Sequence, residues 1–115
     1  MGKSDQIDLT KIMMEEYQRA AAKFGERHNS PHEAYAVMKE EFEEAEEQIN
    51  SHLRTIMRDY WSAVKKSKFD IENNKKLADK IKNSALSAAA ELIQVAAMAH
   101  KASLGFVMVG KCENE

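Results

Sequence analysis

The sequence contains very little proline, glycine or cysteine. Its 115 residues include one proline, Pro31, four glycines and one cysteine, Cys112. Neither proline nor glycine occurs between Pro31 and Leu104. Because a multi-stranded sheet needs turn residues roughly every ten residues, this spacing argues against an all-β or α/β fold and predicts an all-α chain. A single cysteine also excludes an internal disulfide.

Long apolar runs are absent as well. The first residues lack the apolar stretch of a secretory signal peptide, and no apolar run reaches the ~18 residues of a membrane-spanning helix. We therefore expect a cytoplasmic protein without a membrane partner. With 43% apolar and 31% charged residues, the composition is that of a folded domain rather than a disordered chain.

Apolar residues recur at steps of three and four residues, which predicts three helices within a single domain, residues 1–115. We expect these helices over about residues 5–24, 31–67 and 71–104. A flexible C-terminal tail, residues 106–115, would follow the last helix.

Local residues define the expected helix ends. Ser30 is a hydroxyl N-cap, Pro31 occupies the first helical position and Glu33 the third, which together form a capping box. Gly25 supplies the stop of the preceding helix, and Asp70 is a candidate N-cap for the last one.

The second and third expected helices are long for a chain of this size. A helix of roughly 35 residues is about 50 Å long, whereas a compact domain of this length has a radius of gyration of about 13 Å. Either the second helix breaks near Asn50 and Ser51, or the chain forms an oligomer. We favour a bundle of long antiparallel helices assembled as a homo-oligomer, either a dimer or a tetramer.

Charges of opposite sign are segregated, although the formal net charge is only −2. Residues 33–47 hold seven glutamates against Lys39 alone, and residues 65–82 hold seven lysines against three acidic residues. The basic segment is typical of a solvated surface, and it could also draw a polyphosphate towards the acidic region. The acidic overall balance and the lack of a recognised DNA-binding motif argue against a nucleic-acid partner.

The glutamate-rich part of the second helix contains the first candidate site residues. Glu41 and Glu44 lie three residues apart at the edge of the apolar stripe, where they could face a neighbouring helix. Glu40 points further towards solvent. An exposed acidic face remains the ordinary alternative for such a segment.

In the third helix, Glu91 stands in the middle of the alanine-rich residues 85–99, which are apolar on nearly every face. We expect this segment to be buried on most faces, so Glu91 needs a metal ion or a structural lysine or arginine as a partner. Gln94 lies three residues later on the same edge. Two such pairs on neighbouring helices would form an oxygen-rich pocket of the kind that Mg²⁺ or Mn²⁺ occupies.

These segments resemble a known family. Residues 40–44, Glu-Glu-Phe-Glu-Glu, resemble the EExxE motif, and residues 91–94, Glu-Leu-Ile-Gln, a variant of the ExxD motif, of the all-α MazG-like nucleoside triphosphate pyrophosphohydrolases. Residues 12–101 are similar to the short MazG-like proteins of phage and prophage settings. The wider similarity lies in residues 16–25, 30–34 and 91–99.

The resemblance implies Mg²⁺-dependent hydrolysis of a (deoxy)nucleoside triphosphate to the monophosphate and pyrophosphate, in nucleotide-pool control. It also implies an oligomer of long helices. Its metal ligands would be Glu41, Glu44 and Glu91, with Gln94 where the family usually has aspartate. We assign catalytic roles to Glu40 and Glu41 and consider three further residues as substrate-binding: Lys101, His52 and Trp61.

Gln94 also supports an alternative function. Its neutral amide oxygen removes one negative charge from the expected metal site, which lowers the affinity for Mg²⁺. The chain could then be a catalytically weak or inactive helical dimer that acts as a binding or scaffold module.

Overall fold

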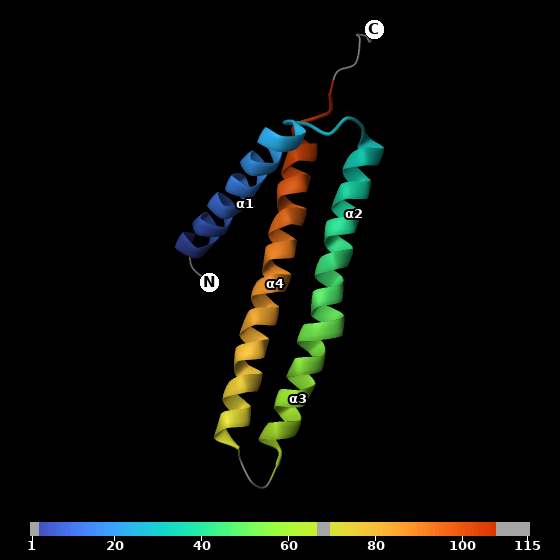
Figure 1. Cartoon of the computed structure of the whole chain (residues 1–115). Helices are drawn as coiled ribbons and strands as arrows, with labels where there is room; N and C mark the ends of the chain where they lie inside the picture. The colour runs from blue at the N-terminus through green and yellow to red at the C-terminus, as the bar shows by residue number, and fades with distance from the viewer. Residues whose placement is uncertain (1–2, 67–69, 108–115) are drawn as a thin grey trace. The chain divides into compact units, whose positions relative to one another are not determined.

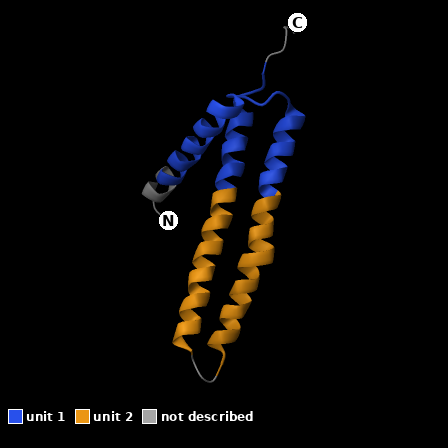
Figure 2. Cartoon of the chain, in the orientation of Figure 1, with its two compact units in different colours: residues 1–42, 92–115 blue, residues 43–91 orange. Residues whose placement is uncertain are grey.

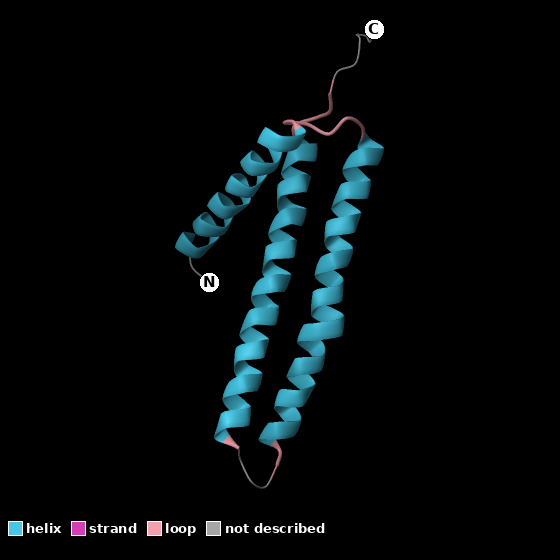
Figure 3. Ribbon diagram, viewed as in Figure 1, coloured by secondary structure: helices cyan, strands magenta, loops and turns pink. Residues whose placement is uncertain are grey.

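The computed structural model describes residues 3–66 and 70–107 (Figure 1). The helices are α1 (Lys3–Phe24), α2 (Pro31–Glu47), the π-helix η1 (Gln48–Leu53), α3 (Arg54–Val64) and α4 (Ile71–Ser103). Figure 3 shows helices and connecting loops in the described part of the chain, with no strand. An isolated bridge pairs His28 with Phe106. The all-α prediction is confirmed.

The helix ends differ slightly from the expected ones. The first helix begins at Lys3 rather than near residue 5, and the last ends at Ser103. Continuous helix from Pro31 ends at Val64, three residues short of the expected end at residue 67, which lies outside the described residues. Of the expected tail, Val107 is tied to His28 by a backbone hydrogen bond of 2.9 Å, and residues 108–115 lie outside the described residues.

Side-chain caps explain where α2 and α4 begin. The Glu33 amide donates to Ser30 Oγ at 3.1 Å, and the Glu33 carboxylate accepts from the Asn29 amide at 2.8 Å. The capping box therefore reaches back to Asn29, the residue before the N-cap. At α4, the Asn73 amide donates to Asp70 Oδ1 at 3.1 Å, which confirms Asp70 as the cap.

Two glycines follow helix ends, and the first of them, Gly25, is the stop that the sequence predicted. Gly25 follows α1 with φ of 97°, and Gly105 follows α4 with φ of 91°. Both angles fall in the left-handed region, which a side chain with a Cβ atom rarely adopts.

The long second helix does not break at Asn50 and Ser51. Instead it continues through the π-helix η1, where the Arg54 amide donates to the Ile49 carbonyl, five residues earlier. The Arg54 guanidinium also donates to Asn50 Oδ1 at 3.2 Å. Such a turn accommodates one extra residue, so the apolar stripe changes its direction here without a chain break.

The chain divides into two compact units (Figure 2). Unit 1 comprises residues 1–42 and 92–115. Its core consists of Tyr17 and Ala20 from α1 together with Ala97 and Met98 from α4. Half-buried apolar side chains pack against this core, among them Met13, Met14, Val37 and Met38.

Unit 2, residues 43–91, contains two helical segments that run in opposite directions. Glu44 interacts with Glu91 at one end of the segments, and the Tyr60 hydroxyl donates to Asn74 Oδ1 at 3.5 Å towards the other. Among the described residues of unit 2, the buried ones are small: Ala45, Ala63, Ala88 and Ser84. Small side chains therefore lie between the two segments.

The expected burial of residues 85–99 on most faces is wrong for the single chain. Leu86 is 63% exposed, and Ala89 and Ala90 are exposed too. The physical reason is that α4 in unit 2 packs against one other helical segment, which covers only part of its circumference. No helix in the described part of the chain is long and apolar enough to cross a membrane.

Candidate functional site

The structure brings Glu44 and Glu91 together in unit 2. Glu44 belongs to α2 and Glu91 to α4, and a carboxylate oxygen of one lies within 4.8 Å of an oxygen of the other. The Glu91 side chain is half-buried, whereas Glu44 is exposed. The sequence placed these residues on two helices expected to be adjacent, and the structure brings their carboxyl groups close together.

This contact changes the acidity of Glu91. A hydrogen bond with the Glu44 side chain, followed by partial burial and by repulsion from the Glu44 charge, raises the pKa of Glu91 above its usual range. Two carboxylates at this distance repel each other unless a proton or a cation lies between them. In the protonated form, the Glu91 carboxyl donates to the Glu44 carboxylate, so the pair can hold either a shared proton or a positive ion.

The other two predicted ligands, Glu41 and Gln94, belong to unit 1. Glu41 is half-buried and precedes Glu44 on α2, and Gln94 follows Glu91 on α4. Both side chains line the same pocket of unit 1, which has a volume of about 510 Å³. Such a volume is in the usual range of small-molecule sites, roughly 300–1,000 Å³.

The pocket of unit 1 combines acidic and basic groups. Glu40, although exposed, lines it together with Glu41, and Arg19 and Lys101 contribute positive charge. Lys101 is only 5% exposed, whereas lysine is among the residues that are least often buried. Glu16 and Glu33 line the same pocket, and Glu16 forms an ion pair with Arg19, so the glutamates outnumber the basic groups of the lining.

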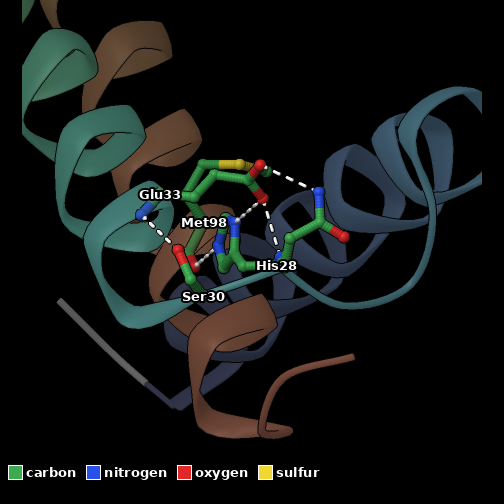
Figure 4. A network of polar contacts seen from close by, with 5 residues as sticks. His28, Ser30, Glu33 and Met98 are labelled. Atoms are coloured by element: carbon green, nitrogen blue, oxygen red, sulfur yellow. Dashed lines mark hydrogen bonds and ion pairs between the residues drawn. The ribbon is translucent and has the colours of Figure 1, made fainter. Parts of the chain in front are cut away.

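A polar network supports the loop between α1 and α2 (Figure 4). His28 is 1% exposed, and its Nε2 donates to the Met98 carbonyl at 3.1 Å, so this nitrogen carries a proton. The other ring nitrogen lies 3.8 Å from the Glu33 carboxylate. Two hydrogen bonds from Asn29, with smaller contributions from His28 and Lys101, lower the pKa of Glu33. The network thus holds a negative charge beside the pocket of unit 1.

The remaining predicted substrate-binding residues lie in unit 2. His52, on η1, lines a pocket of about 280 Å³. Trp61 is 58% exposed, and the Lys65 ammonium lies 5.4 Å from its ring centroid. Trp61 is therefore an exposed side chain. It lines neither the pocket around His52 nor a second pocket of unit 2, which Asp59 and Leu77 line.

Sequence reasoning missed several residues of these sites. His28, Arg19 and Phe24 line the unit 1 pocket, and Ser84 and Lys80 line the pocket around His52. A lone histidine or serine has no periodic pattern, and the His28 partner is 70 residues away in the sequence. Ser84 lies four residues before the buried Ala88, and this spacing is a weak signal that could have found it.

Comparisons with protein-family models, with curated proteins and with solved structures found no match for this chain.

Proposed function

We propose that the chain is a Mg²⁺-dependent pyrophosphohydrolase that cleaves a (deoxy)nucleoside triphosphate to the monophosphate and pyrophosphate. The observation that carries this proposal is the pairing of the Glu44 and Glu91 carboxyl groups from two helices, with the raised pKa of Glu91. The resemblance of residues 40–44 and 91–94 to the MazG-like motifs supports the same activity.

The donor set fits a hard divalent cation. Mg²⁺ and Mn²⁺ prefer carboxylate oxygens, and Glu44 and Glu91 offer two such groups within reach of each other. A cation between these groups would also remove the repulsion that raises the pKa of Glu91. The ligand set that the resemblance implies also includes Glu41 and Gln94, each three residues from one member of the pair.

The chain's own residues have distinct roles in the proposed reaction. Water attacks the α-phosphorus, and the bond from this phosphorus to the oxygen that bridges to the β-phosphate breaks. Glu40 or Glu41 accepts the proton of the attacking water. Lys101, in the same pocket, neutralises phosphate charge. When bound, Mg²⁺ supplies charge neutralisation of the polyphosphate and lowers the pKa of water.

We further propose that the protein works as a homo-oligomer in the cytoplasm. The support is the set of large apolar side chains that the single chain leaves exposed. In unit 2 these are Met57, Trp61, Val64, Ile71 and Leu86. A second copy of the chain could cover these side chains. Analytical ultracentrifugation at increasing dilution tests the proposed oligomer, and we expect a stable dimer or tetramer.

The enzymatic proposal is tested by release of pyrophosphate from a panel of ribo- and deoxyribonucleoside triphosphates with Mg²⁺ or Mn²⁺. We expect turnover by the wild type and its loss in Glu91→Gln. Glu47→Gln is the matched control, because Glu47 is an exposed glutamate on the same helix as Glu44. No turnover by the wild type, or equal turnover in Glu91→Gln, contradicts the proposal.

The alternative is a binding or scaffold module without catalysis, which the neutral amide of Gln94 favours. A ligand that binds only the native state raises the melting temperature. An unchanged melting temperature in Mg²⁺ and Mn²⁺, with an intact oligomer, supports the module. Gln94→Asp then becomes the informative variant, because it restores the fourth negative charge.

A further inference from the structure

The pocket around the π-helix of unit 2 has features that the acidic pair does not explain. Gln48 and His52, four residues apart on η1, line one side. The other side is a polar face of α4, with residues at steps of three and four: Lys80, Asn83, Ser84 and Ser87. Irregular π-turns are frequent at functional sites, because the inserted residue re-aims the side chains around it.

Ser84 is the unusual residue of this pocket. It is 9% exposed, and within the part of the chain that the structure describes its Oγ has no hydrogen-bond partner. A buried hydroxyl without a partner destabilises the fold, whereas alanine would fit the same space. Its neighbours in the inner stripe of unit 2, Ala45, Ala63 and Ala88, are alanines. The hydroxyl is therefore better explained by a ligand than by packing.

The charge of the lining selects the kind of ligand. None of the described lining residues is acidic, and Lys80 contributes a positive charge. The nearest acidic residue in the sequence, Asp79, forms an ion pair of 2.9 Å with Lys82 and accepts from Asn83 at 3.4 Å. The exposed side chains of Lys80 and Ser87 and the buried Ser84 lie around an open pocket of about 280 Å³. Ile56 also lines this pocket, and the hydroxyl and ammonium donors suit a compact anion with several oxygen acceptors.

We propose that this pocket binds a phosphate-type oxyanion through Lys80, Ser84 and Ser87. Its position also fits the proposed function. Gln48 follows Glu44 by four residues and Ser87 precedes Glu91 by four, which is about 6 Å along each helix. The assignment of this anion as the pyrophosphate end of the substrate rests on the proposed function, whereas the site itself does not.

The test is calorimetric titration of the full chain with inorganic pyrophosphate, in EDTA and at constant ionic strength. EDTA removes divalent cations, so the result is independent of the proposed hydrolysis. We expect saturable binding by the wild type that weakens roughly five- to tenfold in Lys80→Gln. Lys82→Gln is the matched control, because it removes the same charge from the same helix outside the pocket, and it should change the affinity less than about twofold.

Ser84→Ala gives a second, independent readout. Loss of the hydroxyl should weaken pyrophosphate binding roughly fivefold and, at the same time, raise the melting temperature of the free chain. A purely structural serine would not produce these opposite effects. Wild-type affinity in Ser84→Ala, equal losses in Lys80→Gln and Lys82→Gln, or no binding by the wild type overturns the proposal.

A nucleoside triphosphate as titrant distinguishes the two sources of the phosphate group. If it binds with the same dependence on Lys80, the pocket takes the substrate's phosphate chain. If only inorganic pyrophosphate binds, the site is a phosphate site for a free anion, and the assignment to the substrate is wrong. If the chain binds pyrophosphate but has no hydrolytic activity, the proposed function is wrong and the anion site in this pocket is supported.

Discussion

The two units of the chain are stabilised in different ways. Unit 1 buries large side chains, with Tyr17 and Met98 in its core and His28 fully enclosed. Unit 2 buries only alanines and Ser84 among its described residues and leaves Trp61 and Leu86 exposed. Helical periodicity alone therefore does not create a core of large side chains. Both units leave large apolar side chains exposed, among them Phe24 and Tyr35 in unit 1, but among the described residues large side chains are buried in unit 1 alone.

The largest expected loss of stability comes from a core residue of unit 1. Tyr17→Ala removes a buried ring, its hydrogen bond to the Glu26 carbonyl at 2.9 Å and its edge contact with His100. We expect a loss of about 3–5 kcal/mol in the free energy of unfolding. Trp61→Ala, at an exposed position, should change the stability of the monomeric chain by less than about 0.5 kcal/mol. Chemical denaturation at high dilution measures the free energy of unfolding of both variants. Similar losses in the two would contradict the difference between a buried position in unit 1 and an exposed one in unit 2.

Overpacking tests the close contact between the helical segments of unit 2. Ala45 is 1% exposed, so Ala45→Leu should cost about 1–3 kcal/mol. Ala89→Leu adds the same atoms at an exposed position of α4 and should be nearly neutral. Thermal unfolding compares the two, and a harmless Ala45→Leu would mean that the segments are not closely packed.

The cap of α2 has a smaller expected effect. Ser30→Ala removes the acceptor for the Glu33 amide, which we expect to lower the free energy of unfolding by about 1 kcal/mol. Ser30→Asp keeps an acceptor at this position and serves as the control. Equal stability of Ser30→Ala and the wild type would show that the capping box is dispensable.

The pH dependence of stability should have opposite signs at the acidic groups of the two units. The pKa of Glu33 is lowered in the folded chain, so its contribution is present above the usual glutamate pKa and is lost as the pH falls through the lowered value. The pKa of Glu91 is raised, so its contribution is present at low pH and is lost as the pH rises through the raised value.

Unfolding midpoints measured from acidic to neutral pH, in EDTA, test the direction of the pH dependence that each of the two glutamates contributes. Glu91→Gln should reduce the loss of stability on the alkaline side, and Glu33→Gln the loss on the acidic side. If Glu91→Gln leaves the pH profile unchanged, the two carboxyl groups of unit 2 do not interact in solution.

The sequence predicts the parts of this structure that depend on local chemistry. Gly25, Ser30 and Asp70 act within a few residues of themselves, so the helix ends they define can be read directly. The sequence predicted a lysine, an arginine or a metal ion beside Glu91, whereas the structure places a second carboxyl group there, that of Glu44. The π-turn at Gln48–Leu53 could not be predicted, because its hydrogen bonds depend on how the helix packs.

The burial of particular residues was harder to predict. Residues 85–99 read as a buried helix, but how much of its circumference is covered depends on the number of neighbouring helices. His28 carries no pattern that identifies it as the most buried polar residue, because its partner on α4 is distant in the sequence.

Binding of Mn²⁺ by the metal-free chain tests the central claim most directly, since Mn²⁺ can be followed by its electron paramagnetic resonance signal. We predict saturable binding by the wild type and by the exposed control Glu47→Gln, and weakened binding in both Glu44→Gln and Glu91→Gln. Equal binding by all four proteins, or none by the wild type, would contradict the claim that Glu44 and Glu91 form a cation site.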